Sequence, residues 1–295
     1  MYISDFNYHK PKSVKEAINL LAKSENGAAI AGGTDILVEI KKGLRNNTDI
    51  ISLSGINELK TLNEDENFFY IGAGLTHSEI IASEILKKNL SAFQDALTKI
   101  GSEQIRNRGT IGGNLCTGAS CCDSAPILMA VNAQVEICNA DKTRKIPLRD
   151  FFLHSHQTAL KKGEIITKII VPKTVAGVGA HYEKFGLREA TSISVVSAAV
   201  MVKIKDNICV DACIVIGAVA PTPLISISST KILIGKNISE LSENSPVLEQ
   251  IGIATSNDSL PIDDIRGSAQ YRRDILKVIT QRAVIKAVIS AKNKL

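Results

Sequence analysis

The sequence predicts an α+β protein built in two parts, and three observations support this fold class. Up to about residue 175, short apolar strand segments alternate with short amphipathic helical segments. After that point, three long strand segments follow one another directly, which is typical of an antiparallel sheet. The stretch 172–179, with one proline and two glycines, has the composition of a linker. We therefore expect one domain over 1–175 and a second over 176–295.

Capping signals and apolar spacing define the elements of the first part. Ser13 with Glu16 and Thr76 with Glu79 have the spacing of capping boxes, and each pair precedes a helical apolar pattern. Residues 101–126 are rich in glycine, so we expect a long functional loop there. The expected helices cover 14–23, 35–42, 77–85, 91–100 and 125–131, and the expected strands cover 28–31, 49–53, 68–72, 134–138 and 165–171.

The second part has longer and more regular patterns. Ser245 followed by Pro246 marks the start of a helix that runs to about residue 256. Apolar residues at helical spacing indicate a final long helix. The expected strands cover 181–187, 195–205 and 210–219, and the final helix covers 268–292.

The composition describes an ordinary globular chain and excludes several classes of function. The 295 residues are 44% hydrophobic, and 35 basic against 30 acidic residues give a net charge of +5. No basic stripe is interleaved with aromatic residues, so we expect no nucleic-acid partner. The longest apolar stretch, near 193–202, is too short to cross a bilayer, so we expect no membrane association. Six cysteines and no visible secretion signal favour a cytoplasmic location.

Two similar glycine motifs are the main candidates for binding. The first is Ala31-Gly32-Gly33-Thr34-Asp35, and the second is Thr110-Ile111-Gly112-Gly113-Asn114. Paired glycines allow positive φ, so that successive N–H groups converge on an anion. The side chains of Thr34, Thr110 and Asn114 can add hydrogen bonds to phosphate oxygens. Two such turns predict that a pyrophosphate is bound from both sides, although each glycine pair could equally form a simple tight turn. Neither a dinucleotide-binding fingerprint nor a P-loop is present.

Other reactive residues are less informative. Asp123 stands at the start of an expected helix, where its carboxylate could cap the helix or accept hydrogen bonds from sugar or ribityl hydroxyls. Cys116, Cys121 and Cys122 lack the spacing of a metal site, so we expect no metal. Histidine is scarce and no nucleophile motif appears, so we expect no catalytic residue.

These motifs resemble those of a known family. "AGGTD", "IGAG", "QIRNRGTIGGN", a spaced Asp123, Pro126, Leu128 and Ala130, and Tyr182 with Lys184 are similar to the FAD-binding subunits of the molybdenum hydroxylases. "GAVAPTP" (217–223) and "RGSAQYRRDIL" (266–276) fit the C-terminal domain of the same subunits. The resemblance covers nearly the whole chain and is greatest to the separate FAD subunit of bacterial xanthine dehydrogenases.

The resemblance implies a fold and a set of cofactor contacts. The fold would be a PCMH-type, VAO-like FAD-binding domain of two α/β subdomains, about 1–55 and 56–175. A C-terminal domain with a three-stranded antiparallel sheet and helices would follow. The implied FAD-binding residues are Ala29, Ile30, Ala31, Gly32, Gly33, Thr34, Asp35 and Ile36 in the first segment, Thr110, Ile111, Gly112, Gly113 and Asn114 in the second, and Ile100, Asp123, Ile166 and Lys184 elsewhere.

The resemblance also implies partners and a reaction. A molybdenum-cofactor subunit would oxidise the substrate, and electrons would pass through [2Fe–2S] clusters on another subunit to FAD and then to NAD⁺. The assembly would be a heterotrimer or its dimer. Nicotinate, CO or an aromatic acyl-CoA are alternative substrates, and ferredoxin or oxygen are alternative acceptors. A stand-alone FAD oxidase, or a scaffold that has lost the flavin, are alternatives of a different kind. Gly113→Val is expected to empty the cofactor site, because valine could not adopt the backbone and would fill the phosphate's space.

Overall fold

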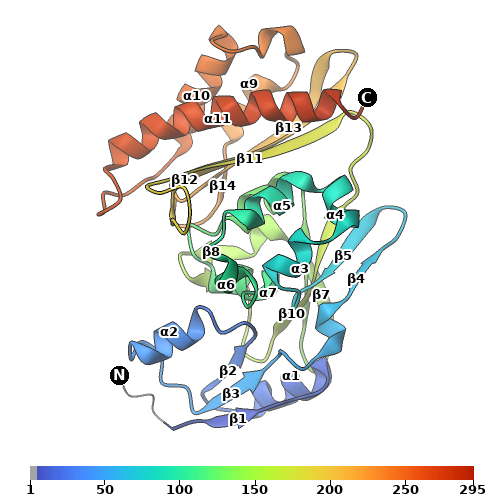
Figure 1. The fold of residues 1–295 in the computed structure, drawn as a ribbon, viewed down its shortest axis with the longest axis vertical. Coiled ribbons are helices and arrows are strands. Elements are labelled where there is room, and N and C mark those ends of the chain that lie inside the picture. The colour runs from blue at the N-terminus through green and yellow to red at the C-terminus, as the bar shows by residue number, and fades with distance from the viewer. Residues whose placement is uncertain (1–4) are drawn as a thin grey trace.

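Three β-sheets follow one another along the long axis of this computed structural model, which describes residues 5–295 (Figure 1). A small sheet near the N-terminus has the strand order β1-β3-β2, and the middle sheet has the order β4-β5-β10-β6-β7. The C-terminal sheet has the order β11-β12-β13-β14. Within the described chain, no helix is both long enough and apolar enough to cross a bilayer.

The N-terminal unit is a small parallel sheet with two helices. Its elements are β1 (Asn7–His9), α1 (Val14–Lys23), β2 (Gly27–Ile30), α2 (Ile36–Lys41) and β3 (Asp49–Ser52). Strand β2 pairs with β3 in parallel, as the predicted β-α-β start requires, and β1, a strand that was not predicted, pairs with β3 in parallel as well. Ser13 caps α1 as predicted, but the Glu16 carboxylate accepts from the amide of Lys12 rather than completing a capping box. The chain leaves β2 at the first glycine motif, so this motif stands at the end of a buried strand.

The middle unit combines an antiparallel sheet with several short helices. Its strands are β4 (Leu62–Glu64), β5 (Phe68–Gly72), β6 (Gln134–Cys138), β7 (Thr143–Pro147) and β10 (Ile165–Pro172), and a small hairpin of β8 (Phe152–His154) and β9 (Gln157–Thr158) lies beside them. Its helices are η1 (Asn57–Lys60), α3 (His77–Ile81), α4 (Glu84–Asn89), α5 (Ser91–Thr98), α6 (Glu103–Arg106), α7 (Ile111–Thr117), α8 (Ser124–Ala130) and η2 (Leu148–Asp150). The Thr76–Glu79 capping box is present at α3 as predicted.

The expectation of a long loop over 101–126 is wrong, because α6 and α7 lie within it. Ser102 caps α6 and Thr110 caps α7 through their side-chain oxygens. Ile111 and Leu115 of α7 are both fully buried. Local caps and burial of an apolar face thus stabilise a helix that two adjacent glycines would otherwise disfavour.

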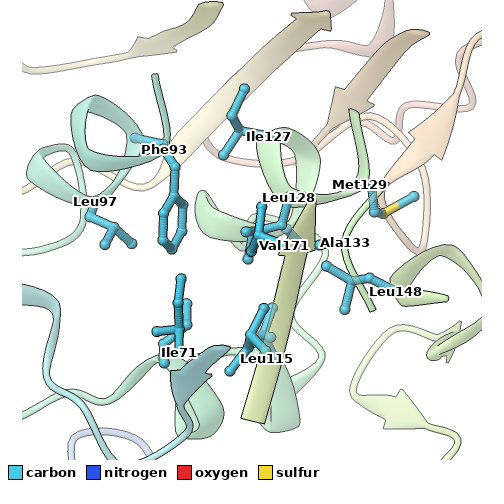
Figure 2. Packing of buried hydrophobic residues seen from close by; sticks show 14 of the residues in the cluster. Ile71, Phe93, Leu97, Leu115, Ile127, Leu128, Met129, Ala133, Leu148 and Val171 are labelled. Carbon is cyan, nitrogen blue, oxygen red and sulfur yellow. The ribbon is translucent and has the colours of Figure 1, made fainter. Parts of the chain in front are cut away.

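The second glycine motif is anchored by the core of the middle unit. Figure 2 shows Leu115 of α7 packed among side chains that come from the sheet and from neighbouring helices. Ile71 of β5 and Val171 of β10 lie close to it, while Phe93 and Leu128 extend from α5 and α8. The first turn of α7 is therefore held rigidly, because the next turn of the same helix is part of this core.

The C-terminal unit is a sheet covered on both faces. Its elements are β11 (Val178–Gly186), β12 (Ser194–Lys205), β13 (Ile208–Gly217), β14 (Leu224–Ile225), α9 (Ile227–Leu233), η3 (Ile238–Glu240), α10 (Pro246–Asp258) and α11 (Ala269–Lys292). Helix α11 lies across one face of the sheet, as Figure 1 shows. Val200 and Ile214 belong to the hydrophobic core that this face forms with the helices of the unit. Tyr182, Ala199 and Val215 instead belong to the core of the middle unit. The three predicted long strands are present, and the short β14 adds a fourth.

Candidate functional site

Both glycine motifs line one cavity of about 480 Å³. The cavity lies between the N-terminal unit and the middle unit, and Gly32, Gly33 and Thr34 face it from one side. Thr110 and Gly113 face it from the other side. The expectation that two motifs almost 80 residues apart share a cleft is therefore consistent with the structure. The volume lies within the range of about 300–1,000 Å³ that is usual for ligand sites.

The first motif also touches the residues that flank the second motif. A Cβ built on Gly32 would lie 1.9 Å from the carbonyl oxygen of Arg108 and 2.9 Å from the Cα of Gly109. No side chain fits at Gly32 while this contact exists. A hydrogen bond of 3.0 Å from the Thr117 hydroxyl to Oδ2 of Asp35 joins the same two segments. The contact at Gly32 fixes the first motif against the segment that leads into the second.

The first motif, which we call the first glycine loop (residues 31–36), has free backbone amides. Gly33 has a φ of +77°, which turns the chain sharply after β2. The N–H groups of Gly32, Gly33 and Thr34 have no hydrogen-bond partner among residues 5–295. Asp35 precedes α2 without capping it, because its side chain accepts no hydrogen bond from the helix. Successive free amides at a turn of this kind are suited to bind an anion.

The second motif, residues 110–114, has a different conformation from the one predicted. Gly112 and Gly113 lie in the first turn of α7, and neither has positive φ. The amide of Ile111 donates to the carbonyl of Leu75 at 3.0 Å, and that of Gly112 donates to the carbonyl of Ala73 at 2.9 Å. The amide of Gly113 donates to the Thr110 side chain at 3.1 Å. The prediction of a second nest of free amides is therefore wrong, because Thr110 and the carbonyl groups of Ala73 and Leu75, which follow β5, accept hydrogen bonds from these amides.

The glycines of the second motif instead allow close approach. A Cβ on Gly112 would lie 2.7 Å from both the Cβ and the carbonyl oxygen of Ala73, so this glycine lets α7 pack on the chain after β5. A Cβ on Gly113 would meet only the Thr110 hydroxyl, at 3.0 Å, and otherwise open space. At Gly113 the second motif thus presents backbone without a side chain to the cavity, rather than a free amide.

Asn114 can still contribute a donor to the cavity. Its Oδ1 accepts a hydrogen bond from the Ser124 hydroxyl at 2.6 Å and from the Cys122 thiol at 3.1 Å. Burial raises the pKa of Cys122 to about 12, so the thiol stays protonated and can donate. Asn114 lines the cavity, and no hydrogen bond is found for its Nδ2 among the described residues. Because Oδ1 is already occupied, the side-chain N–H groups are the donors that Asn114 has left for a ligand.

A second, smaller cavity of about 160 Å³ adjoins the first. Ala29, Ala31 and Gly113 line both cavities, and Ile166 lines only the smaller one. Among the other expected contacts, Ile36 and Ile100 line the larger cavity. Ile30 and Ile111 are buried in the protein and line neither cavity. The apolar contacts implied by the resemblance thus divide between two adjoining spaces and the core.

Asp123 and Lys184 line neither cavity and pair with one another instead. Nζ of Lys184 lies 2.7 Å from Oδ2 of Asp123, and both side chains are less than a tenth exposed. Asp123 also accepts from the hydroxyl of Tyr182 at 2.7 Å and from that of Ser194. Its carboxylate accepts no hydrogen bond from α8, so the alternative of a helix cap is wrong. This network joins α8 to strands β11 and β12, and a contact of either residue with FAD stays a prediction.

Sequence reasoning missed two histidines that line the larger cavity. His156 lies exposed in the turn between β8 and β9, as a surface-loop residue would, and its Nδ1 is 3.0 Å from the carbonyl oxygen of Thr117 at the end of α7. His77 begins α3 and is 2% exposed. No local pattern marks either residue, because both reach the cavity through contacts with the segment 109–117. Among residues 5–295, no group of three His, Cys, Asp or Glu side chains is arranged to hold a metal ion.

Comparison with protein families covers both parts of the chain. Residues 4–174 match the model of the FAD binding domain in molybdopterin dehydrogenase. Residues 180–287 match the CO dehydrogenase flavoprotein C-terminal domain.

Individual relatives align with the chain almost end to end. The carbon monoxide dehydrogenase medium chain of Afipia carboxidovorans is 31% identical, covering 99% of this chain and 100% of its own. The glyceraldehyde dehydrogenase medium chain of Sulfolobus acidocaldarius is 30% identical over 96% and 98% of the two chains. The xanthine dehydrogenase FAD-binding subunit of Escherichia coli O157:H7 is 28% identical over 98% of each chain. A solved structure of Cu,Mo-CO dehydrogenase superposes with a TM-score of 0.93 over 99% of this chain and 100% of that chain, at 31% identity.

Proposed function

Because this chain belongs to the FAD-binding medium subunits of the molybdenum hydroxylase family, we propose that it is the flavoprotein subunit of a xanthine dehydrogenase-like enzyme. In this role it would receive electrons from [2Fe–2S] clusters of one partner subunit, while another partner with a molybdenum cofactor oxidises the substrate. NAD⁺ would be the final acceptor.

The free amides of the first glycine loop are the observation that carries this proposal. Gly32, Gly33 and Thr34 line a cavity of about 480 Å³, and their three N–H groups have no partner among the described residues. The pyrophosphate of FAD is an anion of the kind that such amides bind. Gly113 and Asn114 line the same cavity, so the residues present fit this cofactor.

The chain's own residues would bind and orient the cofactor rather than take part in bond breaking. FAD supplies the redox chemistry, since it can accept electrons singly and deliver a hydride to NAD⁺. Cys116 lines the cavity, but burial raises the pKa of its thiol to about 12. A protonated thiol is a poor nucleophile, which disfavours a covalent flavin link through Cys116.

The substrate is the part of the proposal that depends most on motif resemblance. Relatives named for glyceraldehyde, carbon monoxide and xanthine have similar identities of 30%, 31% and 28%. A nicotinate dehydrogenase FAD-subunit from Eubacterium barkeri is also 31% identical, over 79% of this chain. Since proteins named for such different substrates share this fold, substrate choice would lie in the molybdenum subunit, as the resemblance implies.

Purification of the chain with its native partners tests the proposal. We expect a yellow complex that contains FAD and two further subunits, and that oxidises hypoxanthine with NAD⁺ as acceptor. Parallel assays with CO, nicotinate, glyceraldehyde and an aromatic acyl-CoA compare the alternatives. Activity with one of these substrates alone would refute the xanthine assignment, and activity with ferredoxin but not NAD⁺ would refute the acceptor.

A further inference from the structure

We propose that the imidazole of His77 forms a hydrogen bond to FAD and positions the cofactor in the larger cavity. This inference rests on the proposed function, because it takes FAD as the occupant of the cavity. His77 lies outside both glycine motifs, and its neighbours in sequence form the capping box of α3.

Backbone contacts fix the position of His77 in the wall of the cavity. It is the first residue of α3, and its amide donates to the carbonyl of Gly109 at 3.0 Å. A Cβ on Gly109 would lie 3.3 Å from Cδ2 and 3.5 Å from Nε2 of the imidazole, so this edge of the ring covers Gly109. Gly109 in turn touches Gly32 of the first glycine loop. The imidazole therefore stands where the two glycine motifs meet.

The ring has no hydrogen-bond partner in the part of the chain that the structure describes. His77 is 2% exposed, and Nδ1 is buried without a partner among residues 5–295. No hydrogen bond is found for Nε2 either within the described chain. By contrast, His9, His156 and His181 each have a partner at 2.8–3.0 Å. An unpaired polar group that is buried destabilises a protein, so an orphaned imidazole at the wall of a ligand cavity indicates a partner supplied by the ligand.

The electrostatic surroundings keep this ring neutral. Burial, and then the positive charge of Arg106, lower the pKa of His77 to about 4. A neutral imidazole has one N–H donor and one acceptor nitrogen. It can therefore donate to a phosphate or ribityl oxygen without carrying a charge of its own. The Arg106 guanidinium donates a hydrogen bond of 3.0 Å to the carbonyl oxygen of Ile100. Ile100 is one of the residues that line the cavity.

Substitutions that separate shape from hydrogen bonding test this role. His77→Phe keeps a planar ring but removes both nitrogens, whereas His77→Asn and His77→Gln restore a donor near the positions of Nδ1 and Nε2. The complex is purified, depleted of FAD and titrated with FAD by flavin fluorescence. We expect His77→Phe to weaken FAD binding by about tenfold, which is typical for loss of one hydrogen bond to a buried or charged group. One of the two amide variants should restore most of the affinity.

Two controls distinguish a cofactor contact from a structural role. His154→Phe changes an exposed residue that lines neither cavity, and FAD affinity should not change. Urea unfolding of the FAD-free proteins should show His77→Phe to be at least as stable as the wild type, since it removes unpaired buried nitrogens. Wild-type affinity in His77→Phe, or equal losses of affinity in all three variants, would overturn the inference alone. Failure of the wild-type complex to bind FAD at all would overturn the proposed function as well.

Discussion

The first glycine loop and the second glycine motif have nearly the same sequence pattern but opposite backbone chemistry. In the first loop, a φ of +77° at Gly33 leaves three successive amides unpaired. In the second motif, residues 111–113 form the first turn of α7, and partners within the protein satisfy their amides. Glycine serves the first loop through its conformation and the second motif through its lack of a side chain. Similar motifs therefore need not bind the same ligand in the same way.

The difference follows from what surrounds each motif. The first glycine loop connects β2 to α2, and among residues 5–295 no acceptor bonds the amides of Gly32, Gly33 and Thr34. The second motif lies against the end of β5, where Ala73 and Leu75 offer their carbonyl oxygens. We infer that the first loop supplies the hydrogen bonds to the cofactor, whereas the second supplies a rigid wall at close range.

Gly32→Ala should have the largest effect, because it breaks the contact of the first motif with the residues that flank the second. Its Cβ would lie 1.9 Å from the carbonyl oxygen of Arg108, so one segment must move away. We expect FAD affinity to fall on the order of a hundredfold, because displaced amides lose hydrogen bonds to a charged group, which contribute about 1.5–3 kcal/mol each. Fluorescence titration measures this loss. Near-normal affinity would mean that this contact does not organise the site.

Gly112→Ala should act mainly on stability. The added methyl group would meet the carbonyl oxygen and Cβ of Ala73 at 2.7 Å, where α7 packs after β5. Overpacking of this kind typically costs about 1–3 kcal/mol. Urea unfolding of the FAD-free protein checks the loss, with the exposed Gly43 as a matched position where a Cβ meets nothing within 4 Å. Gly43 has a φ of +73°, so Gly43→Asn is the milder control there.

Gly113→Ala should weaken FAD binding while leaving the fold intact. Backbone strain, the first reason expected for the effect of Gly113→Val, is excluded because Gly113 lacks positive φ. The second reason, that the added side chain fills the space of the phosphate, stays a prediction, and Gly113 does line the cavity. We expect roughly a tenfold loss of affinity for alanine, equivalent to about 1.4 kcal/mol, and a larger loss for valine. Equal affinity for all three residues would show that the cofactor does not approach α7 closely.

Thr110→Val should have the smallest effect and sharpens the comparison of the two amide sets. The change removes the side-chain oxygen that caps α7 but keeps the shape of the residue. Loss of such a cap typically costs about 1 kcal/mol, which thermal or urea unfolding can detect. A smaller loss of FAD affinity than in Gly32→Ala would support the division of roles, and a larger loss would place Thr110 among the main phosphate ligands.

The sequence allowed good prediction of elements with long, regular patterns. Strand β12 and helix α11 were expected almost at their observed limits, because each has an apolar pattern sustained over many residues. The Ser245 cap and the Thr76–Glu79 capping box were also identified, since all their atoms lie within four residues. Local signals of this kind can be read without knowledge of the tertiary structure.

The errors concern residues whose partners are distant in sequence. Asp123 does not cap α8, because Lys184 and Tyr182 from the C-terminal sheet bind its carboxylate. Gly112 and Gly113 belong to a helix, because burial of Leu115 outweighs their low helical propensity. The meeting of the two glycine motifs in one cavity was inferred from their similarity, but which amides remain free depends on contacts that no local pattern reveals.

Amide hydrogen exchange, resolved to single residues and measured with and without FAD, tests the central claim most directly. We predict that the amides of Gly32, Gly33 and Thr34 exchange rapidly without FAD and become protected when FAD binds, because no residue from 5 to 295 pairs with them. The amides of residues 111–114 should be protected in both states. New protection confined to residues 111–114, with no change at Gly32 to Thr34, would contradict the account.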